Sequence, residues 1–110
     1  MEPLRTIGHF GTDGASAVPE LIAALSDSSA DARSAAAASL AQVGPAAAAG
    51  IPALAKALSD PGPHVRALAA IALRAMSPKA AAAVPELTQA LSDPVNYVRA
   101  PAAEAKAAHL

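Results

Sequence analysis

A ten-residue phrase that recurs at a fixed interval is the strongest constraint on the fold of this chain. The three copies read VPELIAALSD, IPALAKALSD and VPELTQALSD, and they begin at Val18, Ile51 and Val84, 33 residues apart. A constant period of about 20–50 residues is typical of repeat proteins, in which each unit is one supersecondary element that stacks on its neighbours. The period therefore predicts a chain built from stacked copies of one unit.

The second half of each unit recurs in the same register, so the unit is longer than the phrase. Equivalent pairs at the same interval are Ala32-Arg33, Val65-Arg66 and Val98-Arg99. In the middle unit, segment A covers about residues 46–59 and segment B about residues 64–76. Segment B repeats apolar residues at i, i+3, i+4 and i+7, which is the spacing of one helix face. The residues of this stripe are Val65, Leu68, Ala69, Ala72, Leu73 and Met76.

Helix formers and helix breakers indicate a fold made of helices. Ala, the best helix former, makes up about a third of the 110 residues. Gly44 followed by Pro45 predicts a helix end, because Gly adopts a left-handed cap and Pro does not continue a helix. Pro52 and its equivalents Pro19 and Pro85 lie early in segment A, where they predict a helix start or a kink. We therefore expect an all-α fold.

The recurring pattern P-x-L-x-x-A-L-S-D, followed by V-R-x-x-A-x-x-A-L, resembles the HEAT repeat, and the middle unit carries it best. The Ala-rich form with a Gly-Pro or Ser-Pro link is similar to the bacterial subclass named for phycobilisome lyases. The resemblance implies a right-handed α-solenoid of stacked antiparallel helix pairs, with the B helices on the concave side. In this family that surface mostly holds other proteins, although one fold hosts many functions.

The register divides the chain into one HEAT-repeat domain over residues 1–110. Its parts are a partial helix B and link at 1–14, and repeats at 15–45, 46–78 and 79–110. Ile7 and Phe10 align with Leu40 and Val43, so the chain begins inside a repeat. A half-helix of this kind is a poor cap for a solenoid, whose terminal units normally have polar outer faces. We therefore expect end-to-end self-association or membership of a longer array.

The third repeat departs from the pattern within its segment B. Pro101 stands where the middle unit has Leu68, and Lys106 stands where it has Leu73. A proline inside a helix removes a hydrogen bond and costs about 3 kcal/mol or more. Two alternatives remain open: the helix kinks near residues 97–101, or it starts late with Pro101 in its first turn.

Two charged positions are constant in every repeat. They are Asp27, Asp60 and Asp93 at the end of segment A, and Arg33, Arg66 and Arg99 in segment B. The resemblance implies that these residues link turn to helix and unit to unit. An Asp at this place also satisfies free N–H groups where segment B begins. A ligand-binding ladder is the alternative interpretation.

The positions that vary between repeats are the better candidates for recognition. Stacking brings them into rows, namely Asp31, His64 and Tyr97; Ala38, Ile71 and Glu104; and Ala41, Arg74 and Ala107. We expect His64, Ile71, Arg74 and Tyr97 to contact a partner, with an exposed Ile71 as an apolar anchor inside a polar rim. The alternative is that Ile71 packs against a neighbouring helix.

Composition argues against several other functions. The net charge of −1 and the scarcity of aromatic residues argue against binding to nucleic acid or to a membrane. Cysteine is absent, and the three histidines occupy different repeat positions, so we expect no catalytic site, metal or cofactor. Residues 34–55 carry no charge, but glycine and proline interrupt them. The first ten residues lack the apolar core of a signal peptide, so we expect a cytoplasmic protein.

These features predict a non-enzymatic module or scaffold that binds another protein on the B-helix face. Two alternatives remain open. The chain is a structural slice of a longer HEAT array with no site of its own, or it handles a bilin in the manner of a phycobilisome lyase.

Overall fold

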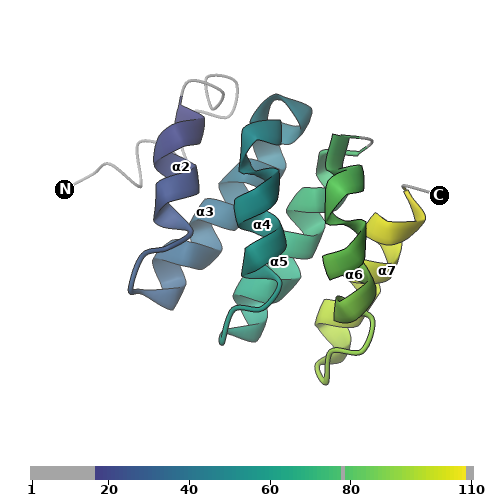
Figure 1. Ribbon diagram of the computed structural model, residues 1–110. Coiled ribbons are helices and arrows are strands. Elements are labelled where there is room, and N and C mark those ends of the chain that lie inside the picture. Colours follow the sequence, from purple (N-terminus) through teal and green to yellow (C-terminus); the bar gives the residue numbers. More distant parts are fainter. Residues whose placement is uncertain (1–16, 78, 109–110) are drawn as a thin grey trace.

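Helix pairs stacked in a row make up the molecule (Figure 1). The structure, a computed structural model, describes residues 17–77 and 79–108, and no strand occurs among them. The elements are α2 (Val18–Ala24), α3 (Ala30–Val43), η2 (Gly44–Gly50), α4 (Ile51–Ala57), α5 (Pro63–Ala75), η3 (Lys79–Ala83), α6 (Val84–Ala90) and α7 (Asn96–Ala107), where η is a 3₁₀ helix. The predicted all-α solenoid is confirmed.

The helices form two layers, which correspond to segments A and B of the sequence. Helices α2, α4 and α6 make the front layer of Figure 1, and α3, α5 and α7 lie behind them. Within the second layer, α5 packs against both α3 and α7. We call the outer surface of α3, α5 and α7 the B face.

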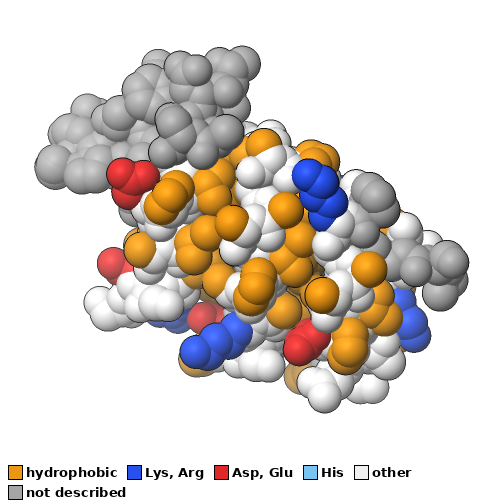
Figure 2. All heavy atoms as spheres, turned by 45° about the horizontal axis from the view of Figure 1, so that its top comes forward, with side chains coloured by type: hydrophobic (Ala, Val, Ile, Leu, Met, Phe, Trp, Pro, Cys, Tyr) orange, Lys and Arg blue, Asp and Glu red, His pale blue; other side chains and the backbone are white. Residues whose placement is uncertain are grey.

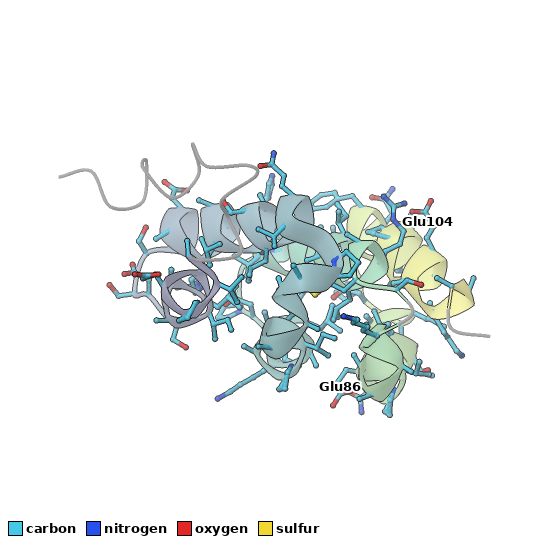
Figure 3. All side chains as sticks on the ribbon, turned by 90° about the horizontal axis from the view of Figure 1, so that it is seen from above. Glu86 and Glu104 are labelled. Carbon is cyan, nitrogen blue, oxygen red and sulfur yellow. The ribbon has the colours of Figure 1, made fainter. Side chains whose placement is uncertain are left out.

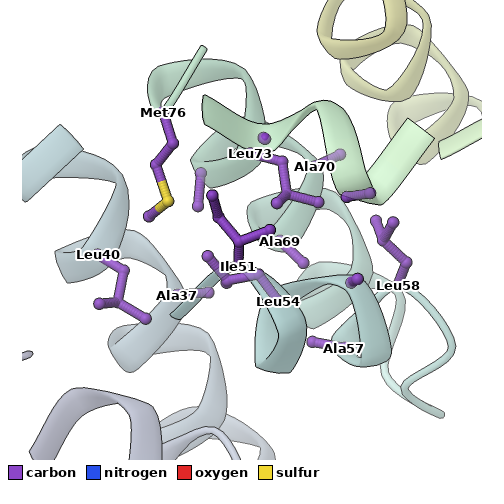
Figure 4. Packing of buried hydrophobic residues seen from close by; sticks show 14 of the residues in the cluster. Ala37, Leu40, Ile51, Leu54, Ala57, Leu58, Ala69, Ala70, Leu73 and Met76 are labelled. Carbon is purple, nitrogen blue, oxygen red and sulfur yellow. The ribbon is translucent and has the colours of Figure 1, made fainter. Parts of the chain in front are cut away.

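The core between the layers repeats from unit to unit. Leu21, Leu54 and Leu87 occupy equivalent positions in the first layer, and all are almost fully buried. Leu40, Leu73 and Met76 fill the second layer from the other side (Figure 4). The alanines at equivalent positions 36, 69 and 102 are completely buried. Because alanine is small, these positions let neighbouring helices approach closely, so the core depends on a few large side chains.

Segment A of the middle repeat is not one continuous α-helix, which corrects the predicted helix over residues 46–59. It begins as η2, contains a non-helical residue at Ala47 (φ −95°, ψ 21°), and becomes α4 only at Ile51. Pro52 is the second residue of α4. Its ring would clash with the carbonyl of Ala48 in a continuous α-helix, and it has no N–H to donate. The start-or-kink alternative for these prolines is therefore resolved as a start preceded by a 3₁₀ turn.

Gly44 ends α3 in a conformation that requires glycine. Its φ is +74° and its ψ is −144°, and its N–H donates to the carbonyl of Leu40. No other described residue has a positive φ. A side chain at this position would meet no close atom, because the nearest is the carbonyl oxygen of Ala75 at 3.8 Å. Any cost of substitution therefore comes from the backbone alone.

We expect Gly44→Ala to lower the free energy of unfolding by about 1–3 kcal/mol, because this backbone region is open almost only to glycine. Gly50→Ala is the control for the backbone; an added Cβ there would lie 3.3 Å from Cγ1 of Ile22, so any loss measures packing against that flexible side chain. Gly50 has a φ of −86° and a ψ of −2°, and Ala17 and Ala83 occupy its equivalent positions. Urea unfolding followed by circular dichroism measures both variants. Equal losses would contradict the assignment of the cost to the backbone of Gly44.

Pro101 lies inside α7, as the sixth of its residues. The helix begins at Asn96, so the alternative of a late start with Pro101 in the first turn is wrong. Pro101 has no N–H to donate to the carbonyl of Tyr97, four residues earlier. Its ring is buried, however, at the position where Leu68 is half-buried in α5. The apolar contact of the position is thus kept while one hydrogen bond is lost.

We expect α7 to be the least protected helix of the second layer in hydrogen exchange. It lacks one internal hydrogen bond, and Lys106 replaces the fully buried Leu73 of α5. Amides of residues 102–108 should exchange at least roughly tenfold faster than those of residues 67–75, because local opening costs less where fewer contacts are lost. Slower exchange in residues 102–108 would contradict this prediction.

The stretch Ala30–Ala57 is long and apolar enough, by composition, to cross a membrane. In the structure it is divided among α3, η2 and α4, which do not form one straight helix. Its Leu40 and Leu54 are fully buried against other helices of the domain.

The predicted partial helix over residues 1–14, with Ile7 and Phe10, lies outside the described residues, as do His9 and His109.

Candidate functional site

Arginine and aspartate join each repeat to the next. The Nε of Arg33 donates to Oδ1 of Asp60 at 2.8 Å, and the Nε of Arg66 donates to Oδ2 of Asp93 at 2.7 Å. In both pairs Nη2 reaches the second carboxylate oxygen, so the contact is bidentate. The four side chains are only 8–15% exposed. We call this arrangement the Asp–Arg ladder, and each pair is one rung.

The same residues also fix the turn between the helices of one unit. Each aspartate accepts the backbone N–H of the residue that caps the next helix, at 2.8–2.9 Å; these residues are Ser29, Gly62 and Val95. Each arginine donates from Nη1 to the backbone carbonyl of the aspartate in its own unit, at 2.7–2.9 Å. The ladder therefore uses its hydrogen-bonding groups within the protein, which favours the structural interpretation over a ligand-binding one.

Asp93 shows the electrostatic effect of a rung. Its pKa is lowered from the ordinary value of 3.8, first because the Arg66 side chain donates a hydrogen bond to the carboxylate. Burial acts in the opposite direction, while the N–H of Val95 and the positive charges of Arg66 and Arg99 lower the pKa further. Asp93 is therefore held in its charged form.

His64 and Tyr97 meet on the B face, as the row through the starts of the B helices predicts. Their ring centroids are 5.3 Å apart, and the rings meet edge to face at 63°. The Tyr97 hydroxyl lies 3.4 Å from Nδ1 of His64. Tyr97 is 46% exposed and is the one large hydrophobic residue exposed in the described part of the chain. An aromatic ring is thus presented to solvent and held on one side by its neighbour.

Arg74 forms an ion pair with Glu104, which belongs to the next repeat. Their side chains are 48% and 57% exposed, and Figure 3 shows Glu104 directed outward from α7. The repeat register places Glu104 in the row of Ala38 and Ile71, but it does not predict Glu104 as a contact residue. Glu104 lies 30 residues after Arg74, which is three residues less than the 33-residue repeat. This offset of about one helical turn brings the side chains of the two stacked helices together and is the sequence signal for the pair.

Ile71 is half-buried. The expectation that its side chain is exposed is therefore wrong. The reason lies in the position of α5, which packs against α3 on one side and α7 on the other. The buried residues of α5 therefore extend beyond one stripe; they include Ala67 and Ala70. Ile71 presents only part of its side chain beside Arg74.

Sequence reasoning missed a groove on the opposite layer. It lies between α4 and α6, has a volume of about 480 Å³, and is lined by Ile51, Pro52, Ala55, Lys56, Ser59, Ala82, Ala83 and Glu86. Apolar side chains cover much of this layer in Figure 2. Oε1 of Glu86 is buried and has no hydrogen-bond partner among the described residues (Figure 3). Alanine and proline at these positions carry no periodic signal that would distinguish a groove from a packed surface.

Stacked helix pairs with a repeated core and a ladder between units define the chain as an α-helical solenoid. A family model described as HEAT repeats matches residues 18–107, and the chain belongs to the HEAT-repeat family. No curated protein matches the sequence. The bacterial phycobilisome-lyase subclass remains a prediction.

Proposed function

We propose that this chain is a non-enzymatic interaction module that binds another protein on its B face. HEAT repeats generally serve as protein-interaction scaffolds. The observation that carries the proposal is the exposed Tyr97 ring, which lies against His64 on this face. Every other large apolar side chain in the described part of the chain is at least half-buried.

Tyr97 suits the centre of a protein interface. Tyrosine is enriched among the residues that contribute most to protein binding, and it has only two side-chain torsions to immobilise. The contact with His64 already restricts the ring, which lowers the entropic cost of binding. A partner that places an apolar side chain over Tyr97 would bury the exposed part of the ring and remove it from water.

Arg74 and Glu104 supply the polar edge of the same surface. Arg74 is ten residues after His64 on α5, so the two side chains are about 15 Å apart along the helix. An exposed ion pair contributes only about 0–1 kcal/mol to stability. Either member is therefore free to exchange its partner for an opposite charge on a bound protein at little cost. The charged groups of this edge therefore contribute more to the selection of a partner with complementary charge than to the affinity of binding.

A pull-down from cell lysate with the immobilised chain tests the proposal. We expect Tyr97→Ala combined with Arg74→Glu to lose captured proteins by about tenfold or more, since loss of a central tyrosine costs about 2 kcal/mol. The double variant Ile71→Asp, Arg74→Glu tests the same face.

Lys56→Glu is the matched control, because it makes the same charge change as Arg74→Glu in the groove between α4 and α6. Capture that is lost with Lys56→Glu and kept with the Tyr97 variant would move the site to the groove. Equal capture by all variants would contradict a site on the B face.

A further inference from the structure

The Asp–Arg ladder has an open position at each end of the described chain. Arg99 donates from Nη1 to the carbonyl of Asp93 at 2.7 Å, as Arg33 and Arg66 do in their own units. Its Nε and Nη2, however, meet no carboxylate among residues 17–77 and 79–108. The Asp27 carboxylate accepts the N–H of Ser29, but no arginine of the described ranges reaches that carboxylate; Arg33 donates only to the Asp27 backbone carbonyl. The α7 end therefore presents the arginine of an incomplete rung, Arg99, and the α2 end presents the aspartate of an incomplete rung, Asp27.

The surface around Arg99 exposes positions that the inner repeat buries. Ala67 and Ala70 of α5 are buried, whereas their equivalents in α7, Ala100 and Ala103, are exposed. Since Ala67 and Ala70 lie on the helix that carries the rung to Asp93, these alanines mark the side of a B helix that receives the next unit. The end of α7 therefore keeps the form of an inner contact surface, and no described residue covers it.

The surface around Asp27 shows the reverse relation at the other end. Ala57 and Val65 of the middle repeat are buried, whereas their equivalents Ala24 and Ala32 are half-buried. Asp27 itself is exposed, whereas the Asp60 side chain is only 10% exposed in its rung. Small side chains lie beside the Asp27 carboxylate here, as they lie beside the Arg99 guanidinium at the other end, and neither group has an ion-pair partner among the described residues.

We propose that the α6–α7 end of one copy of this chain docks onto the α2–α3 end of a second copy, with Arg99 and Asp27 forming a third rung. The charges are complementary, and the two existing rungs provide the geometry. The two surfaces differ, so the contact is head-to-tail and each added copy leaves another open end. The proposal concerns a different surface from the B face and does not rest on partner binding there. Self-association expected from the sequence rested instead on Ile7 and Phe10, which lie outside the described residues.

The contact is weaker than the inner ones. Thr88 stands at the position of the buried Ala55, and Lys106 stands at the position of the buried Leu73. These polar groups raise the cost of covering the end surface. We therefore expect association with a Kd on the order of 100 µM, which is reversible and weakened by salt.

Sedimentation velocity of the full chain over a wide range of concentration tests the proposal. We expect the average mass to rise with concentration at low salt. Arg99→Glu and Asp27→Arg should each remain monomeric alone, because each places like charges at the contact. An equimolar mixture of the two variants should associate again, since Asp27 of one then meets Arg99 of the other. Lys79→Glu, an exposed site with the same change in charge as Arg99→Glu, should associate like the parent.

Several outcomes would overturn the proposal. A mass that stays monomeric at every concentration would do so, as would unchanged association of Arg99→Glu, or a mixture of variants that remains monomeric. Circular dichroism of each variant separates loss of association from loss of folding. Arg99→Gln adds an intermediate case, because it removes the positive charge without introducing repulsion. Association of the Arg74→Glu variant, whose substitution lies on α5 and not on the docking helix α7, should equal that of the parent, so the failure of either proposal leaves the other open to its own test.

Discussion

Replacing Leu54 with alanine is expected to lower the free energy of unfolding by about 3–4 kcal/mol. Leu54 is fully buried in α4 of the middle repeat, and it is one of the few large side chains in an alanine-rich core (Figure 4). Much of the surrounding core cluster is alanine, which has no side-chain torsions with which to fill a cavity, so much of the void should persist and its cost should be high. A domain of this size is stable by about 5–15 kcal/mol, so the loss is a large fraction of the total.

Leu68→Ala is the matched control for this prediction. Leu68 is the same residue type in the same repeat, but it is half-buried. Its loss should stay below about 2 kcal/mol, because less apolar area returns to water. Urea unfolding of both variants, followed by circular dichroism, gives the comparison. Equal losses would show that burial of Leu54 does not control the stability of the repeat.

Replacing Arg66 with methionine is expected to lower the free energy of unfolding by about 2–4 kcal/mol. Methionine keeps much of the apolar length of the side chain but leaves the Asp93 carboxylate, only 8% exposed, without its partner. The variant also removes the hydrogen bonds from Arg66 to the carbonyls of Asp60 and Pro61. Arg74→Met is the matched control, because it breaks an exposed ion pair and should cost no more than about 1 kcal/mol.

The cost of Arg66→Met should depend on pH in the acid range. The pKa of Asp93 in the folded protein lies below its ordinary value of 3.8, mainly because of the hydrogen bond from Arg66. A carboxyl group whose pKa is lower in the folded than in the unfolded protein stabilises the fold at pH values above its unfolded-state pKa. This stabilisation is lost as the pH falls through the folded-state pKa. The difference between parent and variant should therefore be constant near neutrality and shrink below pH 3.8. A difference that stays constant into acid would contradict the assigned role of the rung.

The sequence was sufficient to predict the repeats and much of the core, because both depend on periodicity. The stripe of Val65, Ala69, Leu73 and Met76 is buried as the helical spacing requires. The 3₁₀ start of segment A was not predicted, because an alanine run before Pro52 fits either kind of helix. The distinction depends on the clash between the proline ring and the carbonyl four residues earlier, which becomes decisive only when the whole backbone is built.

The candidate surfaces depended on contacts between units, for which the spacing gave only part of the information. The equivalence of His64 and Tyr97 predicted one row, and the structure brings these two rings together. A single apolar stripe predicts a more exposed Ile71 than the structure has, because a stripe does not describe a helix with neighbours on both sides. The partner of Arg74 depends on the offset between stacked helices, and the groove beside Glu86 depends on the distance between α4 and α6. Neither quantity is encoded in the period alone.

The placement of each rung between consecutive units has a consequence for how such a chain grows. Each unit carries an acid for the unit before it and a base for the unit after it, as Asp60 and Arg66 show in the middle repeat. A tandem duplication of residues 46–78 would therefore carry the aspartate and the arginine that form a rung with the unit on each side. The units are interchangeable, so an ancestral gene could lengthen by duplicating one unit, and no further substitution in the neighbouring units would be needed to form the new salt bridges.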